Sequence, residues 1–475
     1  MIWALPATHR SPPIWIMRSL FISFVVALVA WPNYLAISLP GLPWITLSRL
    51  FVFPLVTIFL GYMSVSKTVR DDTRAVISDN IIIIRLLLAF VIIQLISIPF
   101  SGDPFDSFQK FLIDQVYWTA IFFLSCYLFR DPRFITRCAW ILVALAVWLS
   151  LVGAWEWRLG RVPWAGHIPS FLQINDDAVL RTLAGTTRSG AVAHRVEATF
   201  AVSLGLGEYL ALVTPLIIHF SLEGTSRFPR WSAALILPLV LFTTINSGAR
   251  IGTVGFCASV ILYGGLWAVR RWRIDRRSIL GPAMTLGYPA IAAALLSITF
   301  ISGRLRQIVW GGHNTDPSNQ ARIDQFHMGW PKVLSAPLGH GVGRGAQVLG
   351  YYNGDGVLTI DTYILRLALE YGMIGLFVYY LFFFSAVARG IPGALRATDE
   401  SRKLLMPLSV SILVFLLGKS VYSSEYAHPI PFMMVGAICA LLTGNSAPIP
   451  GGRAPFGRAI RNARIRSTNV LSNHD

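Results

Sequence analysis

The chain has 475 residues, of which 54% are hydrophobic and only 13% are charged, and its mean hydropathy is +0.59. This composition excludes an ordinary soluble domain and is typical of a protein whose helices are solvated by lipid. The net charge of +17 at pH 7 does not indicate a nucleic-acid partner, because most basic residues lie in short connections beside apolar segments. The partner that this charge pattern predicts is the lipid bilayer.

Apolar runs of about 17–25 residues, with a few shorter ones, predict about twelve membrane-spanning helices. In chain order they are Leu20–Ser38, Trp44–Val65, Asn80–Ile98, Phe111–Phe129, Cys138–Ala154, Phe200–Phe220, Trp231–Thr244, Ile251–Val269, Ile279–Ile301, Tyr363–Val387, Leu404–Val421 and Pro431–Thr443. Within these spans we expect Pro32, Pro54, Pro215 and Pro238 to kink the helices, not to end them. The expected fold is an all-α polytopic transmembrane bundle, with one domain over residues 1–444 and a disordered basic tail over residues 445–475.

Arginines mark every second connection between the spans, as in residues 130–137, 270–277 and 389–403. Such clusters stay on the cytoplasmic side. Because an even number of spans puts both termini on one side, and the tail is also basic, we expect both termini to be cytoplasmic. Two long loops, at about residues 156–199 and 302–360, then face outward, although they also carry arginines. We expect these two loops to hold the function.

The second long loop contains two patterns. Ile323, Phe326, Trp330 and Leu334 recur at helical spacing, which predicts a short helix that either lies at the membrane interface or packs over the mouth of the bundle. Gly339, Gly341, Gly343 and Gly345 follow. Since no preceding strand gives them the context of a nucleotide-binding loop, we expect a turn that approaches another element closely.

Ionisable residues at the outer ends of spans are the first candidates for chemistry. Arg250 opens the eighth span, and Asp361, Arg366 and Glu370 open the tenth. A charge at bilayer depth costs about 2.5–3.5 kcal/mol on insertion scales, so its presence implies a partner or a wet cavity. The long loops add Arg181, Arg188, Arg195, Arg304, Arg306, Arg322 and Arg344.

These arginines allow two interpretations. Guanidinium groups bind phosphate oxygens in a bidentate fork, which favours an outward anion site. Alternatively, loop arginines anchor the protein to lipid headgroups. Asp361 and Glu370 could equally be salt-bridge partners of Arg366 and Lys419, and Glu208 could be a helix-packing partner. The outer histidines His313, His327, His340 and His428 are further candidate bases, each expected to be structural or to contact substrate.

Three segments carry a family resemblance. They are NSGARIGTVGF (Asn246–Phe256), the pattern R-x7-W-x6-P-x-G-x-G-x-G that begins at Arg322, and DTYILRLALEYGMIGL (Asp361–Leu376). In order and spacing they resemble the O-antigen ligase and polysaccharide polymerase family, most clearly over about residues 195–444.

That resemblance implies an integral-membrane, GT-C-like glycosyltransferase that uses sugars on polyprenyl pyrophosphate at the periplasmic face. It also implies that Arg250 matches the arginine of the family's Ser-Arg-Gly-like turn, Arg195 the arginine before the sixth span, and Arg322 the arginine of the large loop. Ligases of the family carry histidine and asparagine where this chain has Asp361 and Thr362. An aspartate there resembles exopolysaccharide-type polymerases.

We therefore expect a polymerase that joins polyprenyl-pyrophosphate-linked oligosaccharides in O-antigen or exopolysaccharide synthesis. Asp361 would serve as base or orient the acceptor hydroxyl, while Arg195, Arg250 and Arg322 bind the leaving pyrophosphate without a metal or other cofactor. The expected supporting residues are Arg366, Glu370 and His340.

The expected partners are a lipid-linked glycan donor, a glycan acceptor and a flippase or chain-length regulator. The expected location is the bacterial inner membrane, with the active site facing the periplasm. An O-antigen ligase acting on lipid A-core is the alternative within the family. A secondary anion or solute transporter is the alternative from another class.

Overall fold

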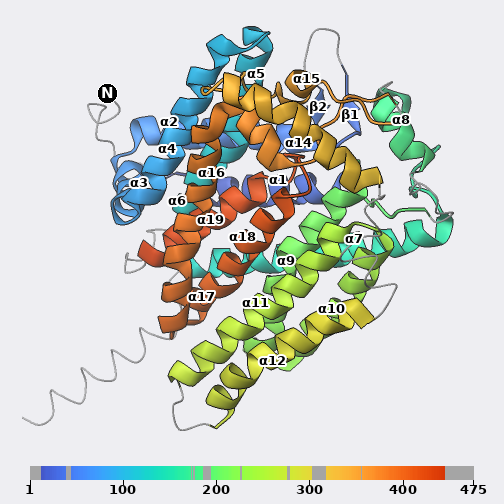
Figure 1. Cartoon of the computed structure of the whole chain (residues 1–475). Coiled ribbons are helices and arrows are strands. Elements are labelled where there is room, and N and C mark those ends of the chain that lie inside the picture. Colours follow the sequence, from blue (N-terminus) through green and yellow to red (C-terminus); the bar gives the residue numbers. More distant parts are fainter. Residues whose placement is uncertain are drawn as a thin grey trace, which may run out of the picture. The chain divides into compact units, whose positions relative to one another are not determined.

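A computed structural model of the chain (Figure 1) describes residues 12–38, 44–172, 174, 177–185, 194–224, 227–274, 279–301, 317–354 and 356–443. The chain divides into two units, Met1–Gly444 and Asn445–Asp475, and every described residue belongs to the first. The predicted basic tail lies outside the described residues, as do Arg188, Arg304, Arg306 and His313.

The first unit is built almost entirely of helices, because a backbone in lipid must satisfy its own hydrogen bonds. The first half contains α1 (Ile14–Ala30), β1 (Ala36–Ile37), β2 (Ile45–Thr46), α2 (Leu47–Val65), α3 (Lys67–Asp79), α4 (Ile81–Ser97), α5 (Pro104–Asp114), α6 (Ile121–Leu128), α7 (Pro132–Leu159) and α8 (Asp177–Ala184). The second half contains α9 (Ser203–Glu223), α10 (Arg227–Asn246), α11 (Arg250–Ile274), α12 (Leu280–Ile301), α14 (Pro317–Ser335), α15 (Gly345–Leu349), α16 (Tyr363–Arg396), α17 (Glu400–Lys403), α18 (Leu405–Lys419) and α19 (Pro429–Thr443). Short 3₁₀ turns cover Ile98–Phe100 and Ser170–Leu172, and a π-helical segment, Gln115–Ala120, joins α5 to α6.

Eight helical stretches among the described residues are long and apolar enough to cross a membrane: α2, α4, α5 with α6, α7, α9, α11, α16, and α17 with α18. The shorter apolar helices α1, α10 and α19 join them, and α12 is a further helix without a charged residue. Together these helices account for all of the predicted spans. The predicted all-α polytopic membrane bundle is confirmed.

The first span differs from its prediction. The helix α1 ends at Ala30, whereas the sequence pattern predicted a span over Leu20–Ser38 with a kink at Pro32. Proline lacks an N–H and disfavours helical geometry in the residue before it, and Trp31 is accordingly extended, at φ −103° and ψ 131°. Beyond Pro32 the chain forms β1, which pairs antiparallel with β2. The other three prolines lie inside α2, α9 and α10, as predicted: Pro54, Pro215 and Pro238.

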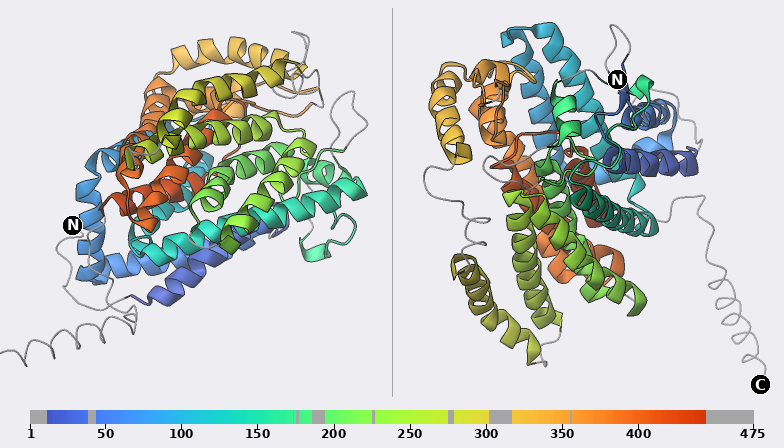
Figure 2. Two further views of the ribbon diagram at one scale, coloured as in Figure 1. Left: turned by 90° about the horizontal axis from the view of Figure 1, so that it is seen from below. Right: turned by 90° about the vertical axis from the view of Figure 1, so that its right-hand side faces the viewer.

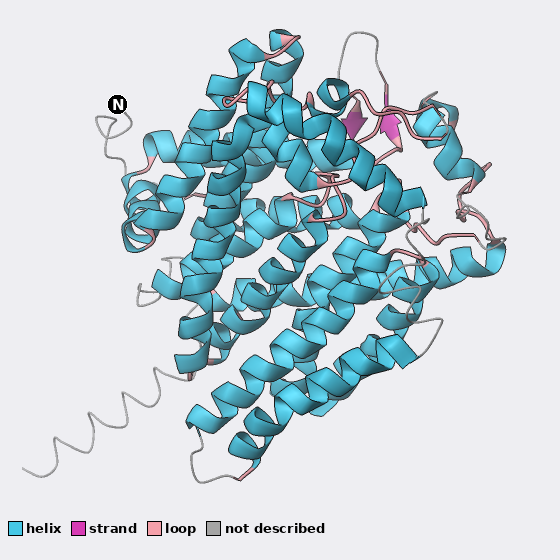
Figure 3. Ribbon diagram, in the orientation of Figure 1, coloured by secondary structure: helices cyan, strands magenta, loops and turns pink. Residues whose placement is uncertain are grey.

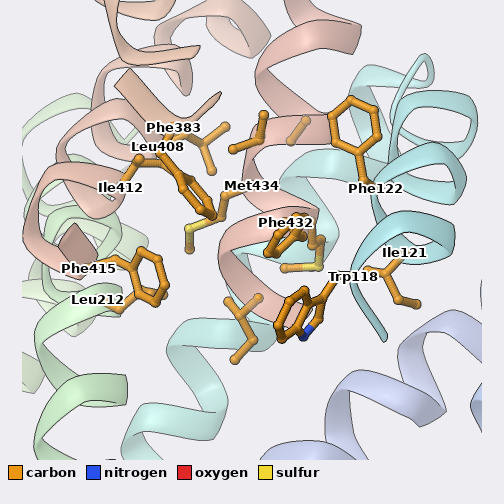
Figure 4. Close-up of a cluster of buried hydrophobic side chains, with 14 of the residues drawn as sticks. Trp118, Ile121, Phe122, Leu212, Phe383, Leu408, Ile412, Phe415, Phe432 and Met434 are labelled. Atoms are coloured by element: carbon orange, nitrogen blue, oxygen red, sulfur yellow. The ribbon is translucent and has the colours of Figure 1, made fainter. Parts of the chain in front are cut away.

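Aromatic side chains fill the apolar core between α6, α9, α16, α18 and α19 (Figure 4). Trp118 stacks on Phe432 with ring centroids 5.5 Å apart, and Phe432 stacks on Phe382 at 5.4 Å. At Gly436 on α19 a Cβ would lie only 2.6 Å from the carbonyl oxygen of Phe122 on α6. Small residues that admit such close approach hold helices together in lipid, where the hydrophobic effect does not.

The connections between helices gather at two ends of this unit. At one end, Arg18 pairs with Asp131 at 2.8 Å, and Arg270 and Lys403 pair with Glu223 at 3.2 and 3.3 Å. The short helix α17 lies at this end and contacts α7 (Figure 1). Connections that carry the arginine clusters therefore lie at the same end of the bundle and are joined by ion pairs.

The opposite end holds α8, α14, α15 and the small β1–β2 sheet, drawn in the upper part of Figures 1 and 3. Here the first long loop meets the end of α1, because Trp164 Nε1 donates to the hydroxyl of Tyr34 at 3.0 Å. Tyr426, from the connection before α19, donates to the carbonyl of Leu28 at 2.6 Å. We call this the loop end. It combines the described parts of both long loops with connections that lack arginine clusters.

A break in α16 shapes the loop end. Gly372 has φ 67° and ψ −179°, so the helix is interrupted directly after the turn that contains Leu369 and Glu370. The freed carbonyls of these two residues accept hydrogen bonds from the backbone N–H groups of His340 and Gly341, at 2.9 and 3.2 Å. The glycine segment after α14 is thus a turn that closely approaches another element, as predicted. A phosphate-binding loop would instead present its N–H groups outward.

Replacing Gly372 by alanine should destabilise the protein. A Cβ at this position would lie 1.9 Å from the carbonyl oxygen of Pro337, and the positive φ would itself be strained. We expect a cost of about 2 kcal/mol or more, measured as a lower thermal unfolding temperature of the purified protein. Gly61→Ala in α2 is the matched control, since no atom lies within 4 Å of its added Cβ. Equal melting of the two variants would contradict this account of the break.

Candidate functional site

The turn between α10 and α11 brings Arg195 and Arg250 into one region. Gly248 in this turn has φ 60°. Arg195 Nε donates to the carbonyl of Ser247 at 3.2 Å, and its Nη2 lies 3.5 Å from the carbonyl of Gly248. Arg250 follows as the first residue of α11, so the N–H groups of that helix N-terminus add positive potential. Both arginines are half-buried.

Asp361 lies directly before α16 and is held by α14. Its backbone N–H donates to Gln325 Oε1 at 2.8 Å. Burial raises the pKa of the Asp361 carboxyl above its ordinary value, and the guanidinium of Arg322 and the side chain of Gln325 oppose that shift. Asp361, the predicted base, and Arg322, a predicted pyrophosphate-binding residue, are therefore electrostatic neighbours.

Arg322 is oriented by its own helix. Its Nη1 lies 3.4 Å from Asn319 Oδ1, and its buried Nε has no hydrogen-bond partner among the described residues. A buried donor of this kind is one that a bound anion would satisfy. Like Asp361, Arg322 is half-buried.

A buried ion-pair network adjoins Asp361. Glu425 Oε2 lies 3.1 Å from Lys110 Nζ and 2.9 Å from Arg366 Nη2. Arg366 Nε also pairs with Glu370 Oε1 at 2.8 Å, which is one of the salt-bridge alternatives that the sequence left open.

The alternative partners considered for Lys419 are wrong. Its Nζ lies 2.6 Å from Glu208 Oε1, not beside Asp361 or Glu370. Glu208 is thus a helix-packing partner that ties α9 to α18.

This network holds the segments on both sides of Asp361. Arg366 Nη1 donates to the carbonyl of Ser423 at 3.1 Å, and the Ser423 hydroxyl donates to the carbonyl of Ile360. Glu370 accepts from the N–H groups of Gly343 and Gly345, at 3.0 and 3.1 Å. Arg366 and Glu370 therefore stabilise the segments that position Asp361.

His340 belongs to the same scaffold. Its Nδ1 lies 3.0 Å from the carbonyl of Leu369, and the residue is half-buried. This contact fastens the glycine segment to the break in α16.

The end of α18 joins the two regions. Ile251, the neighbour of Arg250, packs against Gly418 near the C-terminus of α18. The chain then runs through Lys419 to Ser423, which bonds to the residue before Asp361. In the right-hand view of Figure 2, α14 and α8 both lie in the upper part of the described unit. The four predicted residues, Arg195, Arg250, Arg322 and Asp361, thus share the loop end.

The other predicted outer residues are distributed more widely. Arg344 pairs with Asp106 at 3.0 Å, and His327 is exposed on α14. His428 is buried against the rings of Trp118, Tyr363 and Phe415.

Arg181 belongs to α8, but its side chain lies outside the described residues. Across the described ranges no cluster of three or more His, Cys, Asp or Glu could hold a metal ion.

The predicted helix in the second long loop exists as α14, with an unexpected apolar pattern. Phe326, Gly329 and Val333 face the protein, and Gly329 approaches Leu365 of α16 closely. Ile323, Trp330 and Leu334 are exposed. The helix therefore both packs on the bundle and presents an apolar stripe outward.

Sequence reasoning missed several residues of the scaffold. Glu156 accepts hydrogen bonds from the segment that carries Arg195, while Gln325 and Ser423 fix the backbone at Asp361. Glu156 did carry a signal, because it is a carboxylate at the end of an apolar span. Gln325 and Ser423 carried none, since an amide and a hydroxyl are ordinary in loops.

The comparison with family models places this region in context. Residues 233–380, from α10 to the middle of α16, match the model described as O-antigen ligase. The matched range contains Arg250, Arg322 and Asp361, and it ends within the predicted range of the resemblance. Among curated proteins none matches the sequence significantly. The resemblance is confirmed: this multi-pass membrane protein is similar, over residues 233–380, to the O-antigen ligase family.

Proposed function

We propose that the protein is a polysaccharide polymerase that joins oligosaccharide units carried on polyprenyl pyrophosphate. The family match supports a membrane glycosyltransferase of the ligase or polymerase kind. The observation that carries the finer proposal is the half-buried Asp361 carboxyl, which lies within electrostatic reach of the half-buried guanidinium of Arg322 at the loop end. Permanent positive charge suits a departing pyrophosphate, and a single carboxylate suits an acceptor hydroxyl.

The proposed reaction is one displacement at the anomeric carbon of the donor sugar. The acceptor hydroxyl attacks that carbon, its proton passes to the Asp361 carboxylate, and the bond to polyprenyl pyrophosphate breaks. Arg195, Arg250 and Arg322 stabilise the leaving pyrophosphate, so no acid is needed to protonate it. This differs from glycoside hydrolysis, where a poor leaving group requires two carboxylates. The expected stereochemical outcome is inversion.

The choice of polymerase over ligase depends on Asp361, since ligases of the resembling family carry histidine there. Product analysis in proteoliposomes would decide between them. A polymerase should extend the lipid-linked donor when no other acceptor is present, whereas a ligase should require lipid A-core. Solute flux without any glycosidic product would support the transporter and refute both.

We further propose that the loop end faces the periplasm across the bacterial inner membrane. The arginine clusters at the opposite end support this orientation. A membrane-impermeant maleimide added outside the inner membrane should label Ser335→Cys on α14 and leave Arg396→Cys unlabelled. The reverse pattern would refute the orientation.

The pH dependence of turnover should report Asp361. A base acts when it is deprotonated, so activity falls as the pH drops through its pKa, and burial moves that pKa above the value of an ordinary aspartate. Arg322→Gln removes a positive charge that lowers this pKa. We therefore expect the acid limb of kcat to move to higher pH in Arg322→Gln, besides any fall in its plateau.

The matched control for this prediction is Arg344→Gln, which removes an arginine that pairs with Asp106. Its acid limb should coincide with that of the unaltered protein. An unmoved acid limb in Arg322→Gln, or an equal movement in the control, would contradict the assignment of Asp361 as the base.

A further inference from the structure

Glu156 occupies an unusual position in the last turn of α7. Its carboxylate is fully buried and accepts hydrogen bonds from the backbone N–H groups of Glu197, at 3.0 Å to Oε1, and Ala198, at 2.6 Å to Oε2. Oε1 also lies 2.7 Å from Nε2 of His194. A buried carboxylate needs such partners, because its desolvation is costly. All three partners belong to the segment that carries Arg195.

This segment is held in a strained backbone conformation. Ala198 has φ 51° and is the one non-glycine residue in the described part of the chain with positive φ. A left-handed alanine persists where surrounding contacts enforce it, and such strain often accompanies functional sites. The Val196 N–H donates to the carbonyl of Asn246 at 3.3 Å, and the Thr199 hydroxyl donates to the carbonyl of Val29 at 2.7 Å. The segment is therefore fixed to α7, α10 and α1 at once.

The charge of Glu156 is directed at backbone groups and His194. Its contacts with the N–H groups of Glu197 and Ala198 employ both carboxylate oxygens. The guanidinium of Arg195, by contrast, reaches the carbonyls of Ser247 and Gly248. These carbonyls orient the guanidinium against the turn that leads to Arg250.

We propose that Glu156 is a positioning residue that fixes Arg195 for binding pyrophosphate. It acts through the backbone of residues 194–198 and sets the guanidinium against the turn that leads to Arg250. This inference rests on the proposed function, because it assigns Arg195 to the pyrophosphate of the donor. It adds a residue outside the matched family range to the proposed site.

The test is a binding measurement on the purified full chain in detergent, with farnesyl pyrophosphate as the probe. Glu156→Gln replaces one accepting oxygen by an NH2 group, which opposes a backbone N–H. We expect Glu156→Gln and Arg195→Ala each to weaken binding about tenfold or more, the size expected when a hydrogen bond to a charged group is lost. In the double variant the effects should not multiply, and the second change should add no more than about twofold.

Three comparisons separate positioning from general stability. Glu223→Gln removes a carboxylate that pairs with Arg270 and Lys403 at the other end, and it should leave the affinity unchanged. Glu156→Asp keeps the charge but shortens the side chain, so it should weaken binding less than Glu156→Gln does. If Glu156→Gln unfolds, Glu156→Asp takes its place in the test. Thermal unfolding of each preparation identifies the folded variants.

The outcomes distinguish this inference from the proposed function. If Arg195→Ala and Arg250→Ala both bind the probe as tightly as the unaltered protein, the pyrophosphate site itself is refuted. If Arg195→Ala weakens binding while the folded Glu156 variants do not, only the positioning role is refuted. Effects that multiply in the double variant would also refute it, because Glu156 would then act independently of Arg195.

Discussion

Replacing Asp361 by asparagine should lower glycosidic bond formation by about 10²–10⁴-fold, the typical contribution of a general base. Asparagine keeps the size of the side chain, and the hydrogen bond from the backbone N–H of residue 361 to Gln325 can persist. The pyrophosphate site should remain, so the affinity for farnesyl pyrophosphate should not fall. The measurement is the initial rate of polymer formation in proteoliposomes, with binding measured on the same preparation.

Asp324→Asn is the matched control for this prediction. Asp324 is a half-buried carboxylate on α14 that accepts a hydrogen bond from Gln320 at 2.9 Å, and it has no role in the proposed reaction. Its replacement should leave the rate within about twofold, as is usual for a substitution away from special structural features. A comparable loss in both variants, or full activity in Asp361→Asn, would contradict the assigned role.

Replacing Arg250 by lysine should lower the maximal rate by about 10²–10³-fold, as for the loss of one donor to a developing anion. Lysine keeps the positive charge but lacks the planar fork that binds two oxygens at once. Because the interaction strengthens as the pyrophosphate departs, the loss should appear in kcat more than in KM. The measurement is steady-state turnover over a range of donor concentrations.

The control for Arg250→Lys is Arg396→Lys, which alters an exposed arginine at the end of α16, far along the chain from its break. Its kinetics should match those of the unaltered protein. If Arg250→Lys changes KM alone, Arg250 contributes uniform binding and not stabilisation of the leaving group. If neither constant changes, Arg250 is a lipid anchor, which is the other interpretation of these arginines.

Much of the fold was predictable because lipid imposes a simple rule on the sequence. A spanning helix must be long and apolar, and the arginines between spans record which connections share a side. The errors arose where backbone chemistry overrides hydropathy. Pro32 ends α1 within an apolar run, and Gly372 interrupts α16 within another. Hydropathy averages over a window and registers neither.

The candidate site was predictable in part for a different reason. Arg250 and Asp361 each open a predicted span from the loop end, so the predicted topology alone brings them to one end of the bundle. Their neighbours depend on tertiary contacts that join distant segments. The side chain of Ser423 reaches Ile360, and that of Gln325 reaches the backbone of Asp361. No pattern local in the sequence encodes such pairs.

The sequence marked the charged residues at the loop end as candidate site residues. Their spacing could not separate catalytic or substrate-binding roles from structural ones. Arg366 and Glu370 stand one helical turn apart and form a salt bridge, yet Arg366 also binds Glu425 from the connection between α18 and α19. Glu156 was taken as the start of a loop, whereas it closes α7 and holds another part of that loop. Side-chain geometry, and not residue type, distinguishes these structural residues from the arginines proposed to bind pyrophosphate.

In the proposed reaction, Asp361 and the arginines of the loop end transfer a glycan and release polyprenyl pyrophosphate. The most direct measurement counts both products in proteoliposomes supplied with lipid-linked oligosaccharide extracted from the cells that make this protein. We expect one polyprenyl pyrophosphate for each glycosidic bond formed, with both products lost together in Asp361→Asn and Arg250→Lys. Release of pyrophosphate without bond formation, or bond formation that persists undiminished in both variants, would contradict it.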